Sequence, residues 1–160
     1  MLAAYPQAVA ARVNFYGWAP TGQRSLAEFF YTPLRSEHTV NGFTDVYFSP
    51  LYVGHLAEIL LKMAEQRLEG LYHVFCPQAT SKYAFGVSVA RLFGLDESLI
   101  NPVALQELQT GTPRSLNLSM NTEKLQAALD EPLPGEAEGL QAFYADWQAG
   151  LPDRLVASIA

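Results

Sequence analysis

Residues 8–18 read Ala-Val-Ala-Ala-Arg-Val-Asn-Phe-Tyr-Gly-Trp. The part from Ala8 to Phe15 is apolar nearly throughout, which is typical of a strand buried on both faces of a parallel sheet. It ends in Asn14 and Phe15, and further aromatic residues and Gly17 follow. Ligands of open α/β folds bind at the carboxyl ends of the strands. The stretch therefore predicts both a sheet and the place of a binding site.

Arg24 follows this strand after a loop of Pro, Thr and Gly residues. Aromatic faces suit a sugar ring or a base, and a guanidinium pairs with phosphate through two parallel hydrogen bonds. The residue pattern alone also fits a packed aromatic cluster beside a solvated arginine, because most aromatic residues belong to cores. Both interpretations remain open at this point.

The remaining patterns predict five helices and three or four short strands, in an α/β or α+β chain that packs as one domain over residues 1–160. The expected strands cover residues 8–15, 43–48, 71–76 and 115–120. The expected helices begin at Ser25, at Ser49-Pro50, at Thr80 or Ser81, at Thr122, and shortly before Leu140. Asn41-Gly42 is a turn signal, and Gly94 is a helix end signal.

Two helices carry apolar faces at helical spacing. Ser25 and Glu28 form a capping box at the start of the first of these helices. Its apolar face consists of Leu26, Phe29, Phe30 and Leu34. In the helix that follows Pro50, it consists of Val53, Leu56, Ala57, Leu60, Leu61 and Ala64. We expect both faces to be buried.

Composition excludes several classes of protein. The formal net charge of the 160 residues is -6, and no stretch concentrates Lys and Arg, so we expect no nucleic-acid partner. Cys76 is the single cysteine, which excludes a disulfide within the chain. The sequence has neither a signal peptide pattern nor an apolar run that spans a membrane. The expected compartment is the cytoplasm.

No catalytic group and no metal site is predicted. His38, His55 and His73 are scattered without a second ligand three or four residues away. Cys76 sits in an apolar stretch, where a thiol is inert. The chain also lacks a Gly-x-Ser-x-Gly elbow and a Gly-x-Gly-x-x-Gly phosphate loop.

Five segments, in order along the chain, resemble the extended short-chain dehydrogenases, in particular the dTDP-4-dehydrorhamnose reductase branch. They are residues 12–18 (Arg-Val-Asn-Phe-Tyr-Gly-Trp), 42–53, 70–74 (Gly-Leu-Tyr-His-Val), 81–86 and 114–124. The segment at 70–74 matches a Gly-x-Tyr-His-Val strand of that branch. The segment at 114–124 is similar to its late Arg-Pro-x-Asn-x-x-Leu-x-x-x-Lys stretch, with Ser115 in place of the proline. The resemblance covers about residues 5 to 147.

The resemblance implies partial Rossmann-type sheet elements plus the small α/β C-terminal substrate-binding subdomain of an extended short-chain dehydrogenase. It implies binding of a dTDP- or UDP-linked nucleotide sugar and, in the intact enzyme, NAD(P)H-dependent reduction of that sugar. It suggests Asn14 and Phe15 beside the sugar or nicotinamide, Tyr47 lining the cleft, and Arg24 and Arg114 near the diphosphate. Catalytic residues are not among the positions carried over.

The chain departs from the family where the chemistry lies. Family members carry a Gly-x-x-Gly-x-x-Gly turn and a Tyr-x-x-x-Lys motif before the matching segment, and neither occurs here. His55 stands where relatives commonly have Asp. We therefore expect a substrate-binding fragment that binds no cofactor and is inactive by itself.

Two other hypotheses remain. In the first, the chain is a stand-alone, non-catalytic module that binds nucleotide sugars or self-associates. An apolar strand at 8–15 without neighbours exposes its edge, which favours a homo-oligomer. Alternatively, it obtains a cofactor-binding half from another polypeptide.

Overall fold

The computed structural model describes residues 3–20, 25–108 and 115–158. Its helices are α1 (Leu26–Arg35), α2 (Val53–Glu65), α3 (Lys82–Phe93), α4 (Glu123–Leu129), α5 (Glu136–Gln148) and α6 (Leu151–Ala157). Its strands are β1 (Val9–Val13), β2 (Phe15–Tyr16), β3 (Val40–Phe43), β4 (Tyr47–Phe48), β5 (Leu51–Tyr52), β6 (Gly70–Val74), β7 (Thr80–Ser81), β8 (Ile100–Val103) and β9 (Asn117–Leu118). Short 3-10 turns cover Glu97–Leu99 and Leu105–Glu107.

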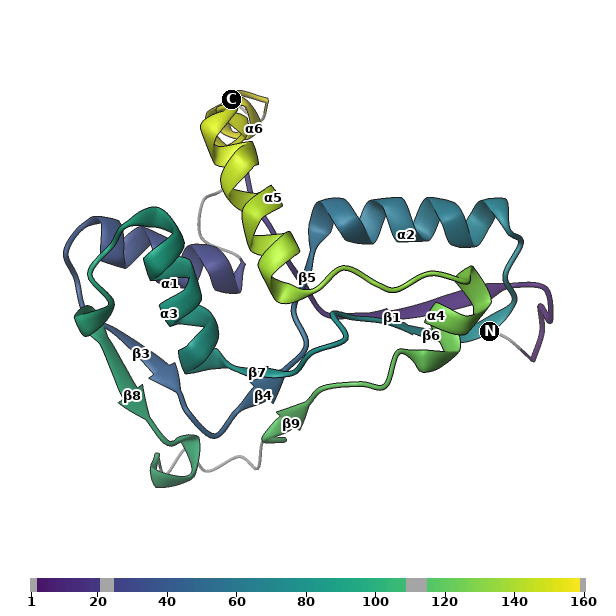
Figure 1. The fold of residues 1–160 in the computed structure, drawn as a ribbon, viewed down its shortest axis with the longest axis horizontal. Helices are drawn as coiled ribbons and strands as arrows, with labels where there is room; N and C mark the ends of the chain where they lie inside the picture. Colours follow the sequence, from purple (N-terminus) through teal and green to yellow (C-terminus); the bar gives the residue numbers. More distant parts are fainter. Residues whose placement is uncertain (1–2, 21–24, 109–114, 159–160) are drawn as a thin grey trace.

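The strands form small, mostly parallel sheets, so the predicted α/β class is confirmed. β1 pairs with β6, β2 with β5, and β3 with β8, all in parallel. β4 lies between β7, which is antiparallel to it, and β9, which is parallel. Figure 1 shows β1, β6, α2 and α4 at one end of the molecule and α1, α3, β3 and β8 at the other, with α5 between them.

The aromatic cluster lies where α1, α3 and α5 meet β2 and β5. In it, Trp18 stacks on Phe143 with ring centroids 4.1 Å apart, and its indole N–H donates to the Phe143 carbonyl oxygen. Tyr16 contacts Phe85 and Phe143 edge-on. Its members are Tyr16, Trp18, Phe30, Tyr31, Phe48, Tyr52, Phe85, Phe93 and Phe143. A second, aliphatic cluster joins α2, β6 and α4.

Local signals placed the helix starts well. Ser25 and Glu28 form the predicted capping box at α1, and the Glu28 carboxylate also accepts a hydrogen bond from the backbone N–H of Ala19. Ser81 caps α3, which ends at Gly94 in the left-handed conformation. On the predicted apolar face of α1, Phe30 is buried, but Phe29 is 50% exposed.

Three further predictions are corrected by strand pairing. Asn41-Gly42 is no turn, because both residues lie in β3 opposite Asn101 and Pro102 of β8. β8 itself was missed. The helix after Pro50 begins only at Val53, because residues 51 and 52 form β5 beside β2.

The buried face of α2 also differs from the predicted one. Leu56, Ile59 and Met63 are its buried residues. Most of the predicted face is exposed instead, namely Val53, Ala57, Leu60, Leu61 and Ala64. We call these five residues the α2 stripe. A helix with two apolar faces has buried the one that meets β6, and the α2 stripe is left facing outward.

β1 is exposed, whereas the sequence predicted a strand buried on both faces. Val9 and Val13 are 37% and 39% exposed. Burial of a strand on both faces requires layers packed on each side of the sheet, and β1 is also open at one edge, because it pairs only with β6 among the described residues.

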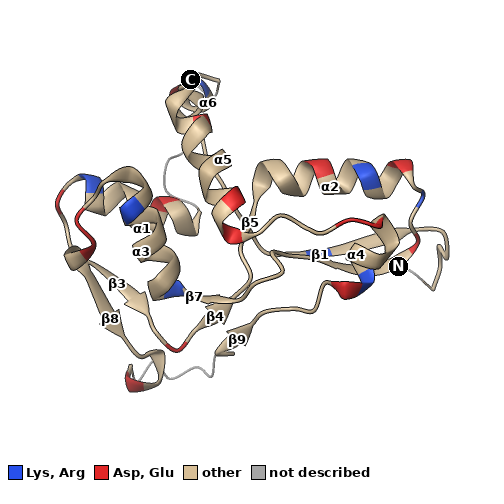
Figure 2. Ribbon diagram, viewed as in Figure 1, with Lys and Arg blue, Asp and Glu red and all other residues tan. Residues whose placement is uncertain are grey.

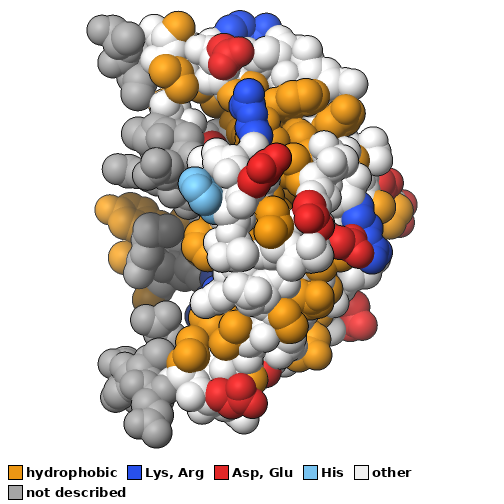
Figure 3. Space-filling model, turned by 90° about the vertical axis from the view of Figure 1, so that its left-hand side faces the viewer, with side chains coloured by type: hydrophobic (Ala, Val, Ile, Leu, Met, Phe, Trp, Pro, Cys, Tyr) orange, Lys and Arg blue, Asp and Glu red, His pale blue; other side chains and the backbone are white. Residues whose placement is uncertain are grey.

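Among the described elements, charged residues lie on the helices and in the connecting segments, and the strands other than β1 carry none (Figure 2). On the end that carries α1 and α3, charged and hydrophobic side chains are interspersed (Figure 3). Among the described helices, none has the length and apolarity needed to cross a membrane.

Candidate functional site

The candidate site begins where β1 ends. Asn14 lies between β1 and β2, and its backbone carbonyl oxygen accepts a hydrogen bond from the Leu51 N–H at 3.0 Å. The next two side chains point in opposite directions, as successive residues of a strand do. Phe15 is 53% exposed, and Tyr16 is fully buried in the aromatic cluster. The backbone therefore presents the Phe15 ring outward beside a half-buried Asn14 side chain.

Tyr47 reaches the same part of the molecule from β4. Its N–H donates to the Leu116 carbonyl oxygen at 2.7 Å, and its ring is 47% exposed, whereas Phe48 is buried. Tyr47 precedes Leu51 by four residues, so their Cα atoms are at most about 14 Å apart. Leu51 in turn pairs with Phe15, so the Cα atoms of Tyr47 and Phe15 lie no more than about 20 Å apart.

The β4 pairing adds residues that were not among the predicted site residues. Tyr47 lies opposite Ser81 and Asn117. Lys82 follows directly, and its N–H donates to the Val46 carbonyl oxygen at 3.0 Å. The Lys82 ammonium lies 5.9 Å from the centre of the Phe43 ring. The Lys82 backbone therefore lies next to β4, while its ammonium lies near Phe43, and in the sequence Lys82 belongs to the segment 81–86 that carries the family resemblance.

The two predicted arginines, Arg24 and Arg114, lie outside the described residues. Their assignment to the diphosphate stays a prediction.

Behind the exposed residues is a layer of buried polar groups. The Tyr16 hydroxyl has no hydrogen-bond partner among the described residues, and burial raises its pKa above the ordinary value. The Tyr52 hydroxyl donates to the Asp146 carboxylate. Burial and this hydrogen bond raise the Tyr52 pKa as well. Both tyrosines are thus neutral at physiological pH and serve to join β2 and β5 to α5.

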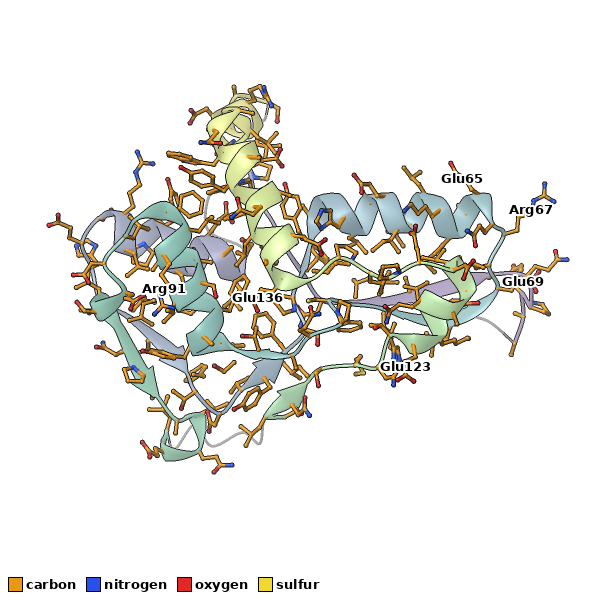
Figure 4. All side chains as sticks on the ribbon, viewed as in Figure 1. Glu65, Arg67, Glu69, Arg91, Glu123 and Glu136 are labelled. Atoms are coloured by element: carbon orange, nitrogen blue, oxygen red, sulfur yellow. The ribbon has the colours of Figure 1, made fainter. Side chains whose placement is uncertain are left out.

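Cys76 is fully buried two residues beyond β6, and its Sγ donates to Gln78 Oε1 at 3.3 Å. Burial raises the pKa of the thiol, and the nearby carboxylate of Glu136 (Figure 4) acts in the same direction. A neutral, inaccessible thiol is a poor nucleophile, in agreement with the prediction of an inert cysteine.

The described histidines do not gather. His55 lies on α2 with its ring edge-on to Tyr52, and its Nδ1 is buried without a partner among the described residues. His73 lies on β6, where its Nδ1 is 3.1 Å from the Asn121 carbonyl oxygen. No group of three or more His, Cys, Asp or Glu side chains in the described ranges is arranged to hold a metal ion.

The described residues include no glycine turn of the kind that binds the pyrophosphate of a dinucleotide. A pyrophosphate needs a glycine turn that leads from a strand into a helix. Among the described glycines, the left-handed conformation occurs at Gly70, which opens a strand, at Gly94, which ends a helix, and at Gly150, which precedes the short α6. None of them joins a strand to a helix.

Comparisons with known proteins agree with this arrangement. The model of the RmlD substrate binding domain family matches residues 2–149. A probable low-salt glycan biosynthesis reductase, Agl14, of Haloferax volcanii is 24% identical over 150 residues, covering 90% of this chain and 50% of the relative.

Two solved structures show the same fold. The dTDP-4-dehydrorhamnose reductase of Clostridium acetobutylicum superposes with a TM-score of 0.74 at 19% identity, over 88% of this chain and 48% of that one. The dTDP-4-dehydrorhamnose reductase of Bacillus anthracis, solved in complex with NADP, gives 0.70 at 17% identity, over 86% and 46%. The chain thus spans about half the length of each of these relatives.

Proposed function

Since the chain belongs to the RmlD substrate-binding domain family, we propose that it is the nucleotide-sugar-binding part of an NAD(P)H-dependent sugar-nucleotide reductase. Residues 1–160 act as one unit in this proposal. The observation that carries it is the family match over residues 2–149, together with exposed aromatic residues at the carboxyl end of β1.

The chain by itself is inactive in this proposal. It has no Tyr-x-x-x-Lys motif in its sequence and hence no proton donor of the kind that the family uses. The described residues also include no glycine turn for the pyrophosphate of NAD(P)H, so the cofactor belongs to the rest of the enzyme. What this chain supplies is recognition of the sugar and its diphosphate.

The exposed groups divide this task by their chemistry. The rings of Phe15 and Tyr47 offer apolar faces to the sugar or the base, and the Asn14 amide offers a donor and an acceptor to hydroxyl groups. Arg24 and Arg114 bind the diphosphate, because a guanidinium matches phosphate oxygens in pairs. Lys82 adds a positive charge at the start of α3, 5.9 Å from the centre of the Phe43 ring.

The test is a thermal-shift titration of the purified chain with dTDP and UDP sugars, with NADPH in parallel. We expect a nucleotide sugar to raise the Tm and NADPH to leave it unchanged, because a ligand stabilises only the state that binds it. Stabilisation by NADPH would contradict the assignment of the cofactor to the rest of the enzyme. Failure of every nucleotide sugar would contradict a pocket in this chain alone.

Variants locate the response. Phe15→Ala removes a ring that is 53% exposed, so the fold should persist. The apparent affinity for the sugar nucleotide, obtained from the thermal-shift titration, should fall at least about tenfold. Phe29→Ala is the matched control, because Phe29 is 50% exposed on α1. Arg24→Ala and Arg114→Ala should raise substrate KM in an enzyme completed with a family cofactor-binding half. An unchanged KM in both would contradict the diphosphate role.

A stand-alone binding module is the second candidate function. The side chains of Phe15 and Tyr47 favour it, because they are 53% and 47% exposed and so available to a ligand. A chain that binds nucleotide sugars tightly by itself, and gains no reductase activity when a family cofactor-binding half is added, would establish it.

A further inference from the structure

The candidate site rests on a short pair of strands. β2 and β5 are two residues long each, and Phe15 lies opposite Leu51. Just before β2, the Asn14 carbonyl oxygen accepts a hydrogen bond from the Leu51 N–H at 3.0 Å. A pair of strands this short is marginally stable by itself. Other contacts must therefore hold the backbone that presents Asn14 and Phe15.

α5 provides such contacts along one of its faces. Gly139, Phe143 and Asp146 follow one another at intervals of four and three residues, so they lie on the same side of the helix. Figure 1 shows α5 rising from beside β5. A Cβ on Gly139 would lie 2.7 Å from the Tyr16 hydroxyl oxygen and 3.2 Å from Tyr52 Cβ. The missing side chain thus lets one tyrosine of each strand approach the helix.

Tyr16 anchors β2 by packing. It is fully buried, and its ring contacts Phe85 and Phe143 edge-on. Its hydroxyl has no hydrogen-bond partner among the described residues. Because successive side chains of a strand point in opposite directions, the burial of Tyr16 sets the outward direction of Phe15.

Tyr52 anchors β5 by packing and by a hydrogen bond. The rings of Tyr16, His55 and Phe143 surround it, with ring centroids 5.8, 5.6 and 6.2 Å away. Its hydroxyl donates to the Asp146 carboxylate. Hydrogen bonds to a carboxylate are stronger than those between neutral groups, and they fix direction as well as distance. A directional tie between the strand pair and α5 therefore comes from Asp146.

We propose that Asp146 is a positioning residue of the nucleotide-sugar site. Its carboxylate holds the Tyr52 ring on α5 and thereby the backbone of β5. The Leu51 N–H of β5 in turn holds Asn14 in place beside Phe15. The proposal rests on the proposed function, because it assigns binding of the sugar nucleotide to Asn14 and Phe15.

Loss of the carboxylate should be felt at the site for a physical reason. The Tyr52 hydroxyl would be left without its acceptor in a buried position, which is unfavourable. The ring would then turn toward another acceptor, and β5 would move with it because the ring is enclosed on several sides. Asp146 therefore acts on the ligand through Tyr52 and Leu51.

Substitutions at the two hydrogen-bonded partners test this role through ligand affinity. The probes are dTDP-glucose and UDP-glucose in a thermal-shift titration. In Asp146→Ala, the apparent affinity should fall at least about tenfold, because groups that bind the ligand are no longer held in place. Tyr52→Phe should lower it in the same direction. Asp146→Asn keeps an acceptor oxygen and should recover most of the affinity.

Lys124→Ala is the matched control. The Lys124 ammonium donates to the Leu71 carbonyl oxygen at 2.8 Å and so ties α4 to β6, at the end of the molecule that carries β1 (Figure 1). Its loss removes a comparable contact between a helix and a strand. The apparent affinity for both probes should stay unchanged.

Amide hydrogen exchange tests the positioning without a ligand. The Leu51 N–H reports on its bond to Asn14, and the N–H of the fully buried Val89 in α3 reports on global unfolding. In Asp146→Ala, exchange at Leu51 should accelerate at least about tenfold relative to exchange at Val89. A contribution to overall stability alone would accelerate both equally.

Equal acceleration at Leu51 and Val89 would overturn the proposal. So would an affinity loss in Lys124→Ala as large as that in Asp146→Ala, or an Asp146→Asn variant as defective as Asp146→Ala. A wild-type chain that binds neither probe would contradict a pocket in this chain alone. Selective acceleration at Leu51 would then still support the positioning role, and its absence would overturn it.

Discussion

The aromatic cluster and the exposed residues of β1 and the α2 stripe are both apolar, but only the aromatic cluster is buried. Tyr16, Phe85 and Phe143 are fully buried, whereas Val13 and Leu61 keep 39% and 64% of their surface exposed. The residues of the aromatic cluster come from α1, α3, α5 and the neighbouring strands, and these elements together bury it. The α2 stripe is exposed in the described parts of the chain. We therefore expect the aromatic cluster to contribute far more to the stability of the fold than the α2 stripe.

The largest expected effect is in the aromatic cluster. Phe143→Ala removes a fully buried ring that stacks on Trp18. Loss of a buried phenyl ring costs about 3–5 kcal/mol of unfolding free energy, from lost transfer energy and the cavity left behind. Urea unfolding followed by tryptophan fluorescence measures the loss. A change below about 1 kcal/mol would mean that the cluster is not the stabilising core.

Close packing within the same region gives a second test. A Cβ at Gly139 would lie 2.7 Å from the Tyr16 hydroxyl oxygen and 3.2 Å from Tyr52 Cβ. Gly139→Ala should therefore destabilise the chain by about 1–3 kcal/mol, because the core cannot take up the methyl group without shifting.

The partner variant is Tyr16→Phe, which removes a buried hydroxyl without a described hydrogen-bond partner. In that background, Gly139→Ala should cost at least about 0.5 kcal/mol less, as expected for two groups in contact. Strict additivity in a double-mutant cycle would argue against the predicted clash.

The contrast between the two regions also explains what could be predicted from the sequence. Local signals were sufficient where a residue acts on its own neighbours, as in the Ser25–Glu28 capping box and the left-handed Gly94. They failed where pairing with a strand distant in the sequence determines the local structure. β8 turned Asn41-Gly42 into part of a strand, and β2 drew Leu51 and Tyr52 out of the expected helix.

Burial on α2 and β1 could not be derived from periodicity. α2 carries two apolar faces, and periodicity does not say which one meets a partner within the chain. The apolar pattern of β1 predicts neighbours on both edges, but the described residues supply one.

At the candidate site, Asn14 and Phe15 followed from the rule on strand ends. Tyr47 came from the family resemblance, and Lys82 was missed because its position depends on the pairing of β4 with β7.

A third test concerns the end of the molecule that carries β3 and β8, where the Asp45 carboxylate accepts hydrogen bonds from the N–H groups of Leu105 and Gln106 at 2.8 and 3.1 Å. The bond from Leu105 contributes most to lowering the pKa of this carboxyl. Because the folded pKa lies below the unfolded value of about 3.9, its stabilising effect is present above that pH and is lost as the pH falls through the folded pKa.

Asp45→Asn should therefore have a lower Tm than the wild type at pH 6, and the difference should shrink below about pH 4. Thermal unfolding followed by circular dichroism from pH 6 to pH 2.5 measures it. A difference that stays constant across this range would mean that ionisation of Asp45 does not contribute.

The smallest effect is expected on the α2 stripe. Leu61→Gln replaces a side chain that is 64% exposed, so folding of a single copy removes little of its surface from water. The unfolding free energy should change by no more than about 0.5 kcal/mol, in contrast to Phe143→Ala. The measurement is urea unfolding at a protein concentration where light scattering shows a monomer, since dissociation of a dimer would add to the apparent change. A loss above about 1 kcal/mol under these conditions would mean that the α2 stripe packs within its own chain. The distinction between a buried, stabilising region and an exposed one would then fail.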